Sequence, residues 1–285
     1  MLEVTWRAGV RGSPIEHSLS PVLHRAAYRA LGLREWSYDR ARVEADELCD
    51  HVAGLDASWR GLSLTMPLKE VAFEVVHTAA PLATRVGSIN TLIRDEVGWS
   101  GHNTDVHGIV EALRAAGVTA IGSAVVVGAG ATARSAVAAV AELGAARVTF
   151  MVRESVRVKT LELAAALGVP AASAPMGDWP HGCDVVIGTV PGAAYGSLVG
   201  RLPAGGPGRA VLDCVYGAGP SPLLVAATQL GYAAVPGTEM LLHQAREQVR
   251  LMTGHEAPIE PMRAALAAAL DDLRAVVQPM TEARP

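Results

Sequence analysis

The sequence predicts an α/β protein of two domains, one with a mixed, mostly parallel sheet and one with a parallel sheet. Three observations lead to this fold class. The chain has 285 residues, about twice the length of a typical domain. Short apolar runs alternate with helical patterns, at the spacing of the crossovers in parallel sheets. Near the middle of the chain, a glycine-rich turn follows a run typical of a buried strand.

The first predicted helix covers residues 20–31. Ser20 is a good N-cap, and Pro21 suits the first helical position. Apolar side chains then recur on one face of the helix, and Gly32 is expected to end it.

Further elements are expected before residue 118. A short apolar run lies over residues 61–66, and Pro67 begins a second helix with an apolar face. Residues 101–105 resemble the start of another helix, which Gly117 is expected to end.

A second unit begins at Ser123 and alternates strand and helix. Buried strands are predicted over residues 124–127, 147–152, 184–188 and 210–215. An alanine-rich helix that ends at Gly144 and a helix over residues 161–167 lie between them. From Glu239 onward the pattern is wholly helical.

The turn after the first of these strands has a GxGxxA pattern formed by Gly128, Gly130 and Ala133. The two glycines permit a tight turn and a close approach of the backbone to a pyrophosphate, and the helix N-terminus supplies amide donors. The flanking strand and helix favour a Rossmann-like dinucleotide-binding domain over a glycine-rich turn without a ligand.

The end of the next strand indicates which dinucleotide binds. An acidic residue there usually holds the ribose 2′-hydroxyl of NAD. This chain has Arg153, whose guanidinium suits a 2′-phosphate, so NADP is the predicted cofactor. Glu154 is an unfavourable neighbour for a phosphate. Arg157 and Lys159 lie close behind, either near the cofactor or on a solvated helix face.

Two places in the first hundred residues are candidates for chemistry. Ser18 and Ser20, just ahead of the first helix, would suit a carboxylate, although plain N-capping explains them equally well. Lys69 falls in the first turn of the helix that Pro67 opens, where the helix dipole disfavours an ammonium. Such a local inconsistency often marks a functional site, and the residue could donate and take back a proton.

Asp105 is the complementary candidate, a carboxylate that could hold Lys69 in place. The alternatives are a surface lysine and an aspartate that merely caps a helix. A metal site is not expected, because His102 and His107 have a spacing that suits no helix face and no Cys or carboxylate pattern completes a site.

Composition excludes several other classes. The net charge is −4 and no basic run exceeds two residues, so neither nucleic acid nor an anionic membrane is an expected partner. Glycine and proline interrupt the two uncharged stretches, residues 115–133 and 214–238, so neither reads as a membrane span. The N-terminus has no apolar signal core and the three cysteines form no CxxC pair, so a cytoplasmic protein is expected.

Taken together, six motifs in order resemble the shikimate dehydrogenase family nearly from end to end. They lie at residues 12–21 (GSPIEHSLSP), 64–69 (LTMPLK), 87–92 (GSINTL), 101–105 (GHNTD), 211–224 (VLDCVY followed by SPLL) and 237–245 (GTEMLLHQA). The resemblance implies a substrate domain formed by residues 1–105 and 239–285 and a Rossmann NADP-binding domain formed by residues 106–238.

The resemblance also implies site residues. Lys69 and Asp105 would be the catalytic pair, and both would bind substrate together with Ser18, Ser20, Thr65, Asn90, Tyr216 and Gln244. The cofactor would contact Gly128, Ala129, Gly130, Ala131, Ala133, Arg153, Thr189, Val215 and Gly237.

Four places in the chain depart from the family pattern. The proline that follows the family's tyrosine motif is replaced by Ala218. Ser63 stands where the family usually has Asn, just before the threonine–proline–lysine segment. The family's NRT cofactor motif reads VRE over residues 152–154, which weakens the NADP assignment. Its Asn-Ala-Thr stretch near the nicotinamide reads GTV over residues 188–190.

The predicted function is the reversible reduction of 3-dehydroshikimate to shikimate with NADPH, an oxidoreductase step toward chorismate and the aromatic amino acids. Two alternatives stay open: a quinate/shikimate dehydrogenase that uses NAD, and a non-catalytic metabolite sensor on the same scaffold. A small-molecule substrate is the expected partner, and the sequence leaves open whether the chain forms a homodimer.

Overall fold

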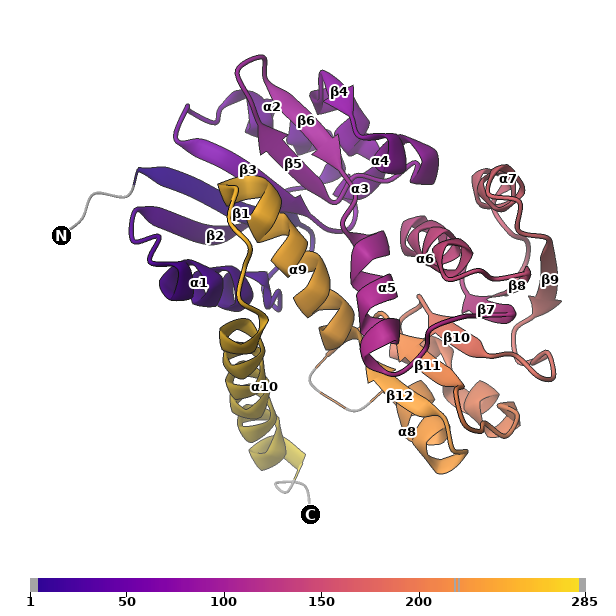
Figure 1. Ribbon diagram of the computed structural model, residues 1–285. Coiled ribbons are helices and arrows are strands. Elements are labelled where there is room, and N and C mark those ends of the chain that lie inside the picture. The colour runs from indigo at the N-terminus through magenta and orange to yellow at the C-terminus, as the bar shows by residue number, and fades with distance from the viewer. Residues whose placement is uncertain (1–4, 218, 220, 282–285) are drawn as a thin grey trace. The chain divides into compact units, whose positions relative to one another are not determined.

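The computed structural model describes residues 5–217, 219 and 221–281 (Figure 1). The chain divides into two compact units. Unit 1 comprises the chain up to Thr104 and the chain from Leu242 onward, and unit 2 comprises Asp105–Leu241. Each unit contains one six-stranded sheet, so the predicted α/β class is confirmed.

Unit 1 is built on a mixed sheet with the strand order β2-β1-β3-β5-β6-β4. Its strands are β1 (Trp6–Gly12), β2 (Trp36–Arg42), β3 (Trp59–Leu64), β4 (Thr78–Ala79), β5 (Thr91–Arg94) and β6 (Trp99–His102). β1 pairs in parallel with both β2 and β3, whereas β5 is antiparallel to β3 and β6.

The helices of unit 1 come from both ends of the chain. They are α1 (Ser20–Leu31), α2 (Leu48–Ala53), α3 (Leu68–Val71), α4 (Pro81–Val86), the C-terminal part of α9 (Gly237–Thr253), and α10 (Ile259–Thr281). α10 packs against α1, which brings the end of the described chain back to its beginning. A buried core that includes Trp59, Leu62, Leu68 and Leu92 joins β3 and β5 to the segment after β3.

Unit 2 is built on a parallel sheet with the strand order β12-β11-β10-β7-β8-β9. Its elements are α5 (Asp105–Ala115), β7 (Ser123–Val127), α6 (Ala131–Glu142), β8 (Arg147–Val152), α7 (Val158–Ala166), β9 (Ala171–Pro175), β10 (Val185–Gly188), β11 (Ala210–Asp213), α8 (Pro222–Gln229), β12 (Ala233–Pro236) and the start of α9. Counted from β7, this is the 3-2-1-4-5-6 order of Rossmann dinucleotide-binding domains. The order reverses between β7 and β10, which is where such sheets bind ligands.

The start of α1 differs from the sequence prediction. Leu19 is the N-cap, and no side chain caps the helix there, so the prediction that Ser20 is the N-cap is wrong. Ser20 is instead the first residue of the helix, next to Pro21. The predicted end is confirmed, because Gly32 adopts the left-handed conformation, with φ of 72°, and its amide donates to backbone carbonyls of the last turn.

The helix predicted to open at Pro67 also differs. α3 is a single turn, Leu68–Val71, followed by a 3-10 segment over Ala72–Val75. One turn has only a small dipole, so the helix-dipole argument for an unusual Lys69 loses its basis.

Candidate functional site

The glycine turn of unit 2 connects β7 to α6. Gly128 has φ of 109°, a conformation that L side chains rarely adopt. A Cβ atom at Gly128 would lie 2.6 Å from Thr189 Oγ1 and 2.9 Å from a methyl group of Val190. Thr189 donates from Oγ1 to the Val127 carbonyl at 2.7 Å, which holds the loop after β10 against the turn. The sequence of the turn is therefore dictated by its backbone shape and by this close approach.

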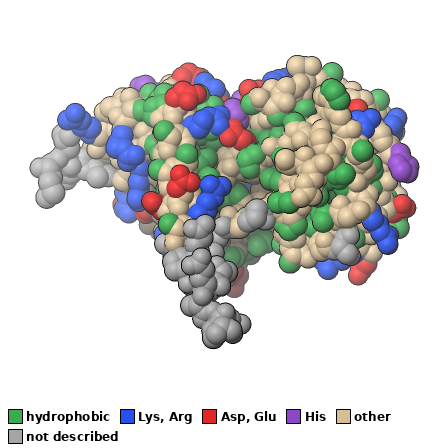
Figure 2. All heavy atoms as spheres, turned by 90° about the horizontal axis from the view of Figure 1, so that it is seen from below, with side chains coloured by type: hydrophobic (Ala, Val, Ile, Leu, Met, Phe, Trp, Pro, Cys, Tyr) green, Lys and Arg blue, Asp and Glu red, His purple; other side chains and the backbone are tan. Residues whose placement is uncertain are grey.

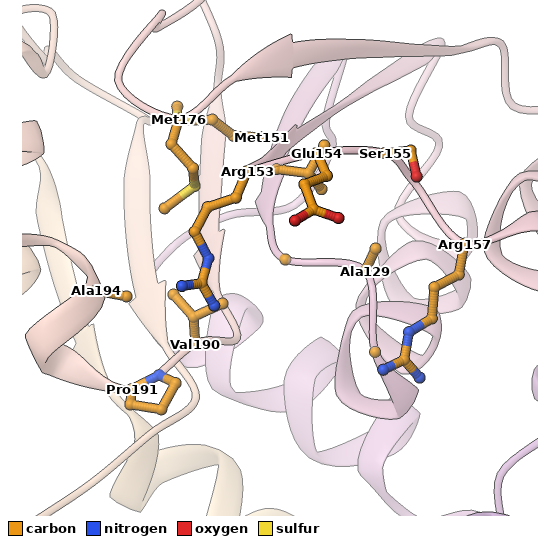
Figure 3. A pocket seen from close by; sticks show the side chains of 13 residues that line it. Ala129, Met151, Arg153, Glu154, Ser155, Arg157, Met176, Val190, Pro191 and Ala194 are labelled. Carbon is orange, nitrogen blue, oxygen red and sulfur yellow. The ribbon is translucent and has the colours of Figure 1, made fainter.

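A cavity of about 570 Å³ lies at this turn (Figure 3). Its lining comes from the turn, the end of β8, the segment before α7 and the loop after β10: Gly128, Ala129, Gly130, Met151, Val152, Arg153, Glu154, Ser155, Arg157, Met176, Val190, Pro191 and Ala194. Met151, Met176, Val190 and Pro191 supply apolar surface. Backbone amides at the start of α6 have no acceptor within the helix, so the cavity offers an anion site beside an apolar wall.

Three charged side chains line this cavity. The guanidinium groups of Arg153 and Arg157 and the carboxylate of Glu154 are drawn around it in Figure 3, and all three residues are exposed. Two cations suit a phosphate, and the carboxylate between them in sequence opposes it. Lys159, which the sequence placed near Arg157, is exposed and is not among the lining residues.

The other residues predicted to contact a cofactor lie outside the lining of this cavity. Ala131 begins α6, and Ala133 is fully buried in it, where a small side chain permits close packing. Val215 is 39% exposed in the loop after β11. Gly237 begins α9, where a Cβ atom would lie 2.5 Å from the Asp213 carbonyl oxygen. Their contacts with a cofactor stay predictions.

Asp213 is a buried carboxylate at the end of β11, next to these loops. Ser221 donates to it at 2.5 Å, the amide of Val215 at 3.2 Å and the Tyr195 hydroxyl at 3.4 Å. Burial raises the pKa of this carboxyl group. Asp213 therefore fixes the start of the loop that carries Val215 and Tyr216, a role that a sequence motif alone does not reveal.

In unit 1, two loops meet where the parallel strands β1 and β3 end. The amide of Thr65 donates to the Arg11 carbonyl at 2.9 Å, and the amide of Ser13 donates to the Met66 carbonyl at 2.8 Å. A Cβ atom at Gly12 would lie 2.3 Å from the Thr65 methyl group. The serine-containing loop and the threonine–lysine loop, far apart in sequence, are therefore held edge to edge.

Ser18 and Ser20 lie in the first of these loops and at the start of α1. Ser18 is partly buried, and its Oγ accepts a hydrogen bond of 3.4 Å from the Ser20 amide. Ser20 is 5% exposed. Carboxylate binding by this pair stays a prediction.

Lys69 lies in the second loop region, partly exposed, within α3. Its carbonyl accepts a hydrogen bond of 2.8 Å from the Ile89 amide, so its backbone is tied to the residue before Asn90. The chain contains only two lysines, Lys69 and Lys159, beside 22 arginines. This imbalance is a sequence signal for Lys69 that the pattern analysis did not use, because arginine cannot give up its proton and lysine can.

Asn90 is the centre of a buried polar cluster in unit 1. Its Oδ1 accepts from the Thr104 amide at 2.8 Å, and its Nδ2 donates to Thr104 Oγ1 at 2.9 Å. Gln244 Oε1 lies 3.4 Å from Asn90 Nδ2 and 3.3 Å from Thr104 Oγ1. The structure thus brings together two of the predicted substrate residues, Asn90 and Gln244, through Thr104, which the sequence analysis did not single out.

Asp105 and Tyr216 belong to unit 2. Asp105 is 4% exposed and is the first residue of α5, directly after Thr104 in the chain. Tyr216 is partly buried in the loop after β11. The pairing of Asp105 with Lys69, and the approach of Tyr216 to a substrate, stay predictions.

The described residues also bear on three other kinds of site: charged surfaces, membrane spans and metal sites. Positive and negative side chains lie near each other at several places on the face shown in Figure 2. Within the described ranges, no helix combines the length and the apolar character needed to cross a membrane. Among the same residues, no group of three or more His, Cys, Asp or Glu side chains is placed to hold a metal ion.

Two family models match the chain. The shikimate dehydrogenase substrate-binding domain matches residues 10–92, and the shikimate 5′-dehydrogenase C-terminal domain matches residues 237–267. The first contains the two loops of unit 1 and Asn90. The second contains Gly237, Gln244 and the remainder of α9.

Similar proteins cover almost the whole chain. A shikimate dehydrogenase (NADP(+)) of Natronomonas pharaonis is 37% identical, over 92% of this chain and 98% of that protein. The crystal structure of Mycobacterium tuberculosis shikimate dehydrogenase is 40% identical and has a TM-score of 0.84. The match covers 92% of this chain and 99% of that chain. The Thermus thermophilus shikimate 5-dehydrogenase in complex with NADP(H) and shikimate is 28% identical, has a TM-score of 0.76, and is covered to 99% by 93% of this chain.

Proposed function

The chain belongs to the shikimate dehydrogenase family, and we propose that it catalyses the reversible reduction of 3-dehydroshikimate to shikimate with NADPH. A similar enzyme from Thermus thermophilus has been crystallised with NADP(H) and shikimate, which supports this substrate and this cofactor. The reaction needs a site for the dinucleotide, hydrogen-bonding groups for a polyhydroxylated carboxylic acid, and a proton donor for the developing alkoxide.

The glycine turn and cavity of unit 2 fit NADP. The turn permits close approach of a pyrophosphate to the start of α6. A side chain at Gly128 would clash with Thr189 and Val190, so the turn needs glycine there. Arg153 and Arg157 would hold the 2′-phosphate, and the apolar wall beside them would hold the adenine. When bound, NADPH supplies a hydride to the carbonyl carbon.

Lys69 is proposed as the proton donor and acceptor. In the reductive direction its ammonium group gives a proton to the carbonyl oxygen as this oxygen becomes a hydroxyl. In the oxidative direction the neutral amine takes this proton back. Asp105 would orient the ammonium and share its charge. General acid–base help of this kind typically contributes 10²–10⁴-fold to a rate.

The remaining polar residues would position the substrate. Ser18 and Ser20 would bind its carboxylate, as hydroxyls and free amides at a helix start can do. Asn90, Asp105 and Thr65 would bind the ring hydroxyls. Tyr216 and Gln244 would lie beside the ring.

The single observation that carries the proposal is the cluster of Asn90, Thr104 and Gln244. These three polar side chains are buried and bind one another, and Gln244 comes from a distant part of the chain. The residue before Asn90, Ile89, donates from its amide to the Lys69 carbonyl. Burying a polar group costs free energy unless the group is hydrogen-bonded, and these side chains bind one another. A polyhydroxylated ring is the ligand that suits them.

The experiment is a steady-state assay of the purified protein with shikimate and NADP⁺, which follows the absorbance of NADPH. We expect NADPH to form only when both are present, and to disappear when 3-dehydroshikimate is added. Parallel assays with quinate and with NAD⁺ test the quinate/shikimate dehydrogenase alternative. Binding of shikimate without turnover would contradict the proposal and indicate a sensor.

A further inference from the structure

A series of buried hydrogen bonds connects Tyr38 on β2 to Asn90 in unit 1. The Tyr38 hydroxyl donates to Ser63 Oγ at 2.6 Å, and Ser63 donates to Gln248 Oε1 at 2.8 Å. Gln248 Nε2 donates to Thr91 Oγ1 at 2.9 Å, and Thr91 donates to Asn90 Oδ1 at 2.9 Å. Every residue in the series is buried. The series therefore cannot exchange its partners for bulk water without exposing the core.

All four hydrogen bonds run in the same direction, from the tyrosine to the asparagine. Asn90 Oδ1 accepts from Thr91 and, at 2.8 Å, from the Thr104 amide, and the Thr104 hydroxyl lies 3.3 Å from the same oxygen. Rotation of this amide by half a turn is disfavoured, because its NH₂ group would then face the Thr104 N–H, which can only donate. The NH₂ group of Asn90 is thus directed toward Thr104 Oγ1 and Gln244 Oε1.

Gln248 is the central member of this series, and its hydrogen-bonding capacity is fully used. Its Nε2 donates both to Thr91 and, at 3.3 Å, to the Asn90 carbonyl. Its Oε1 accepts from Ser63 and lies 3.2 Å from His24 Nε2. Burial keeps His24 neutral, since it lowers the pKa of the imidazole to about 3, and the ring stacks on Tyr38 at 3.9 Å.

Ser63 explains why the amide of Gln248 matters in this chain. A serine hydroxyl has a single donor hydrogen. Ser63 donates that hydrogen to Gln248 Oε1. The donors for Thr91 and for the Asn90 carbonyl then come from Gln248, which reaches them from α9.

We propose that Gln248, supported by Ser63 and Tyr38, is a positioning residue that holds the Asn90 amide in the orientation in which its NH₂ group can donate to a hydroxyl of the substrate ring in place of Gln244 Oε1, which lies 3.4 Å away. This inference rests on the proposed function, because it takes Asn90 to be a substrate-binding residue. It assigns to Gln248 no contact with the substrate itself.

The test is the near-isosteric variant Gln248→Met, which keeps the volume and removes all the hydrogen bonds. We expect the KM for shikimate to rise about tenfold, with kcat and the KM for NADP⁺ within about twofold of the wild type, as loss of one or two hydrogen bonds implies. Ser63→Ala should raise the KM for shikimate about threefold, and Tyr38→Phe less, because they lie further from Asn90. The control is Thr253→Val, which removes a hydroxyl of the same helix that donates to the Val249 carbonyl and accepts from the His255 amide.

A merely structural role would lower the thermal stability of Gln248→Met and leave the KM for shikimate unchanged in the folded fraction, which would overturn the inference. Crystal structures of the wild type and Gln248→Met provide an independent readout. We expect the Asn90 side chain to change its rotamer or its partners, and an unchanged Asn90 would also overturn the inference. If the wild type itself fails to turn over shikimate, the proposed function is wrong, and the two crystal structures alone decide the positioning role.

Discussion

The two candidate binding regions of this protein are built on opposite principles. In unit 1, the polar cluster around Asn90 is buried, and its side chains hold one another through hydrogen bonds. In unit 2, the cavity at the glycine turn is shaped by backbone, and its charged side chains, Arg153, Glu154 and Arg157, are exposed. A buried hydrogen-bonded group is costly to leave unpaired, whereas an exposed charge is screened by water and salt.

The difference leads to a general expectation for this fold. Substitutions in the polar cluster of unit 1 should disturb hydrogen bonds or proton transfer, and their effects on the kinetic constants should be large and independent of salt. Changes of side-chain charge at the cavity of unit 2 should have smaller effects that weaken as the salt concentration rises. The glycines of the turn are the exception, because there the backbone itself is the binding surface.

The largest effect is expected for Lys69→Ala. Because the proposal gives this residue the proton transfer, kcat should fall by at least about 100-fold while the KM for shikimate changes little. The kcat of Lys69→Arg should fall by a similar factor, since a guanidinium keeps the positive charge and cannot release its proton at neutral pH. The measurement is the steady-state rate of shikimate oxidation at saturating NADP⁺.

Lys159→Ala is the matched control, because it removes the other lysine of the chain, which is exposed on α7 and does not line the cavity. It should keep wild-type kcat. A Lys69→Ala enzyme that retained half of its activity would refute the proposed role and would leave unit 1 as a binding region without chemistry.

The second largest effect is expected for Gly128→Ala. The new methyl group would lie 2.6 Å from Thr189 Oγ1, and the residue would have to keep φ of 109°. We expect about 1–3 kcal/mol of lost stability, the cost of a strained backbone conformation. The KM for NADP⁺ should rise as well, because the turn must shift. Thermal unfolding without ligand measures the first effect and steady-state kinetics the second.

Gly130→Ala separates the two requirements. Gly130 has an ordinary negative φ of −86°, and a Cβ atom there would meet no atom within 4 Å. The variant should therefore keep its stability without ligand and still bind NADP⁺ more weakly, because the methyl group would lie where the pyrophosphate approaches. Equal losses of stability in Gly128→Ala and Gly130→Ala would contradict the view that the fold requires glycine only at position 128.

Four of the six strands of the unit 2 sheet were predictable from local sequence, whereas its edge strands β9 and β12 and much of unit 1 were not. The strand predicted over residues 147–152 matches β8 residue for residue, because RVTFMV is rich in the β-branched and aromatic residues that favour strands. β1 reads WRAGVRG and was not predicted, although it lies between β2 and β3. Its two arginines stack on Trp59, at 4.6 Å and 4.8 Å from the ring centre, which makes charged residues compatible with a central strand.

The same contrast holds for the sites. The glycine turn is local, so one short motif reveals both the turn and the flanking elements. The buried series in unit 1 joins Gln248 to Ser63, Thr91 and His24, at separations of 185, 157 and 224 residues. No local pattern encodes such partners, because each is selected by tertiary packing. Sequence could therefore indicate Asn90 as a site residue but not what orients it.

A smaller effect is expected for Arg153→Ala. Loss of one charge-assisted hydrogen bond to a 2′-phosphate should raise the KM for NADP⁺ about tenfold and leave the KM for NAD⁺ nearly unchanged. The loss should shrink at high salt, unlike the effect of Gln248→Met. Arg157→Ala is the companion variant, since its guanidinium also lines the cavity. A proportional rise for both cofactors would show that the arginines do not recognise the phosphate.

The smallest effect is expected for Glu154→Gln, and its sign is informative. The carboxylate lines the cavity together with two guanidinium groups, so it should repel a 2′-phosphate and accept a hydrogen bond from a 2′-hydroxyl. The variant should lower the KM for NADP⁺ by about two- to threefold and raise the KM for NAD⁺, because exposed charges interact weakly. If both constants stay unchanged, the carboxylate points away from the ribose and cofactor choice depends on the arginines alone. If the KM for NADP⁺ rises instead, Glu154 must position Arg153 or Arg157. Binding in the cavity would then depend on side chains that hold one another, as in the cluster around Asn90.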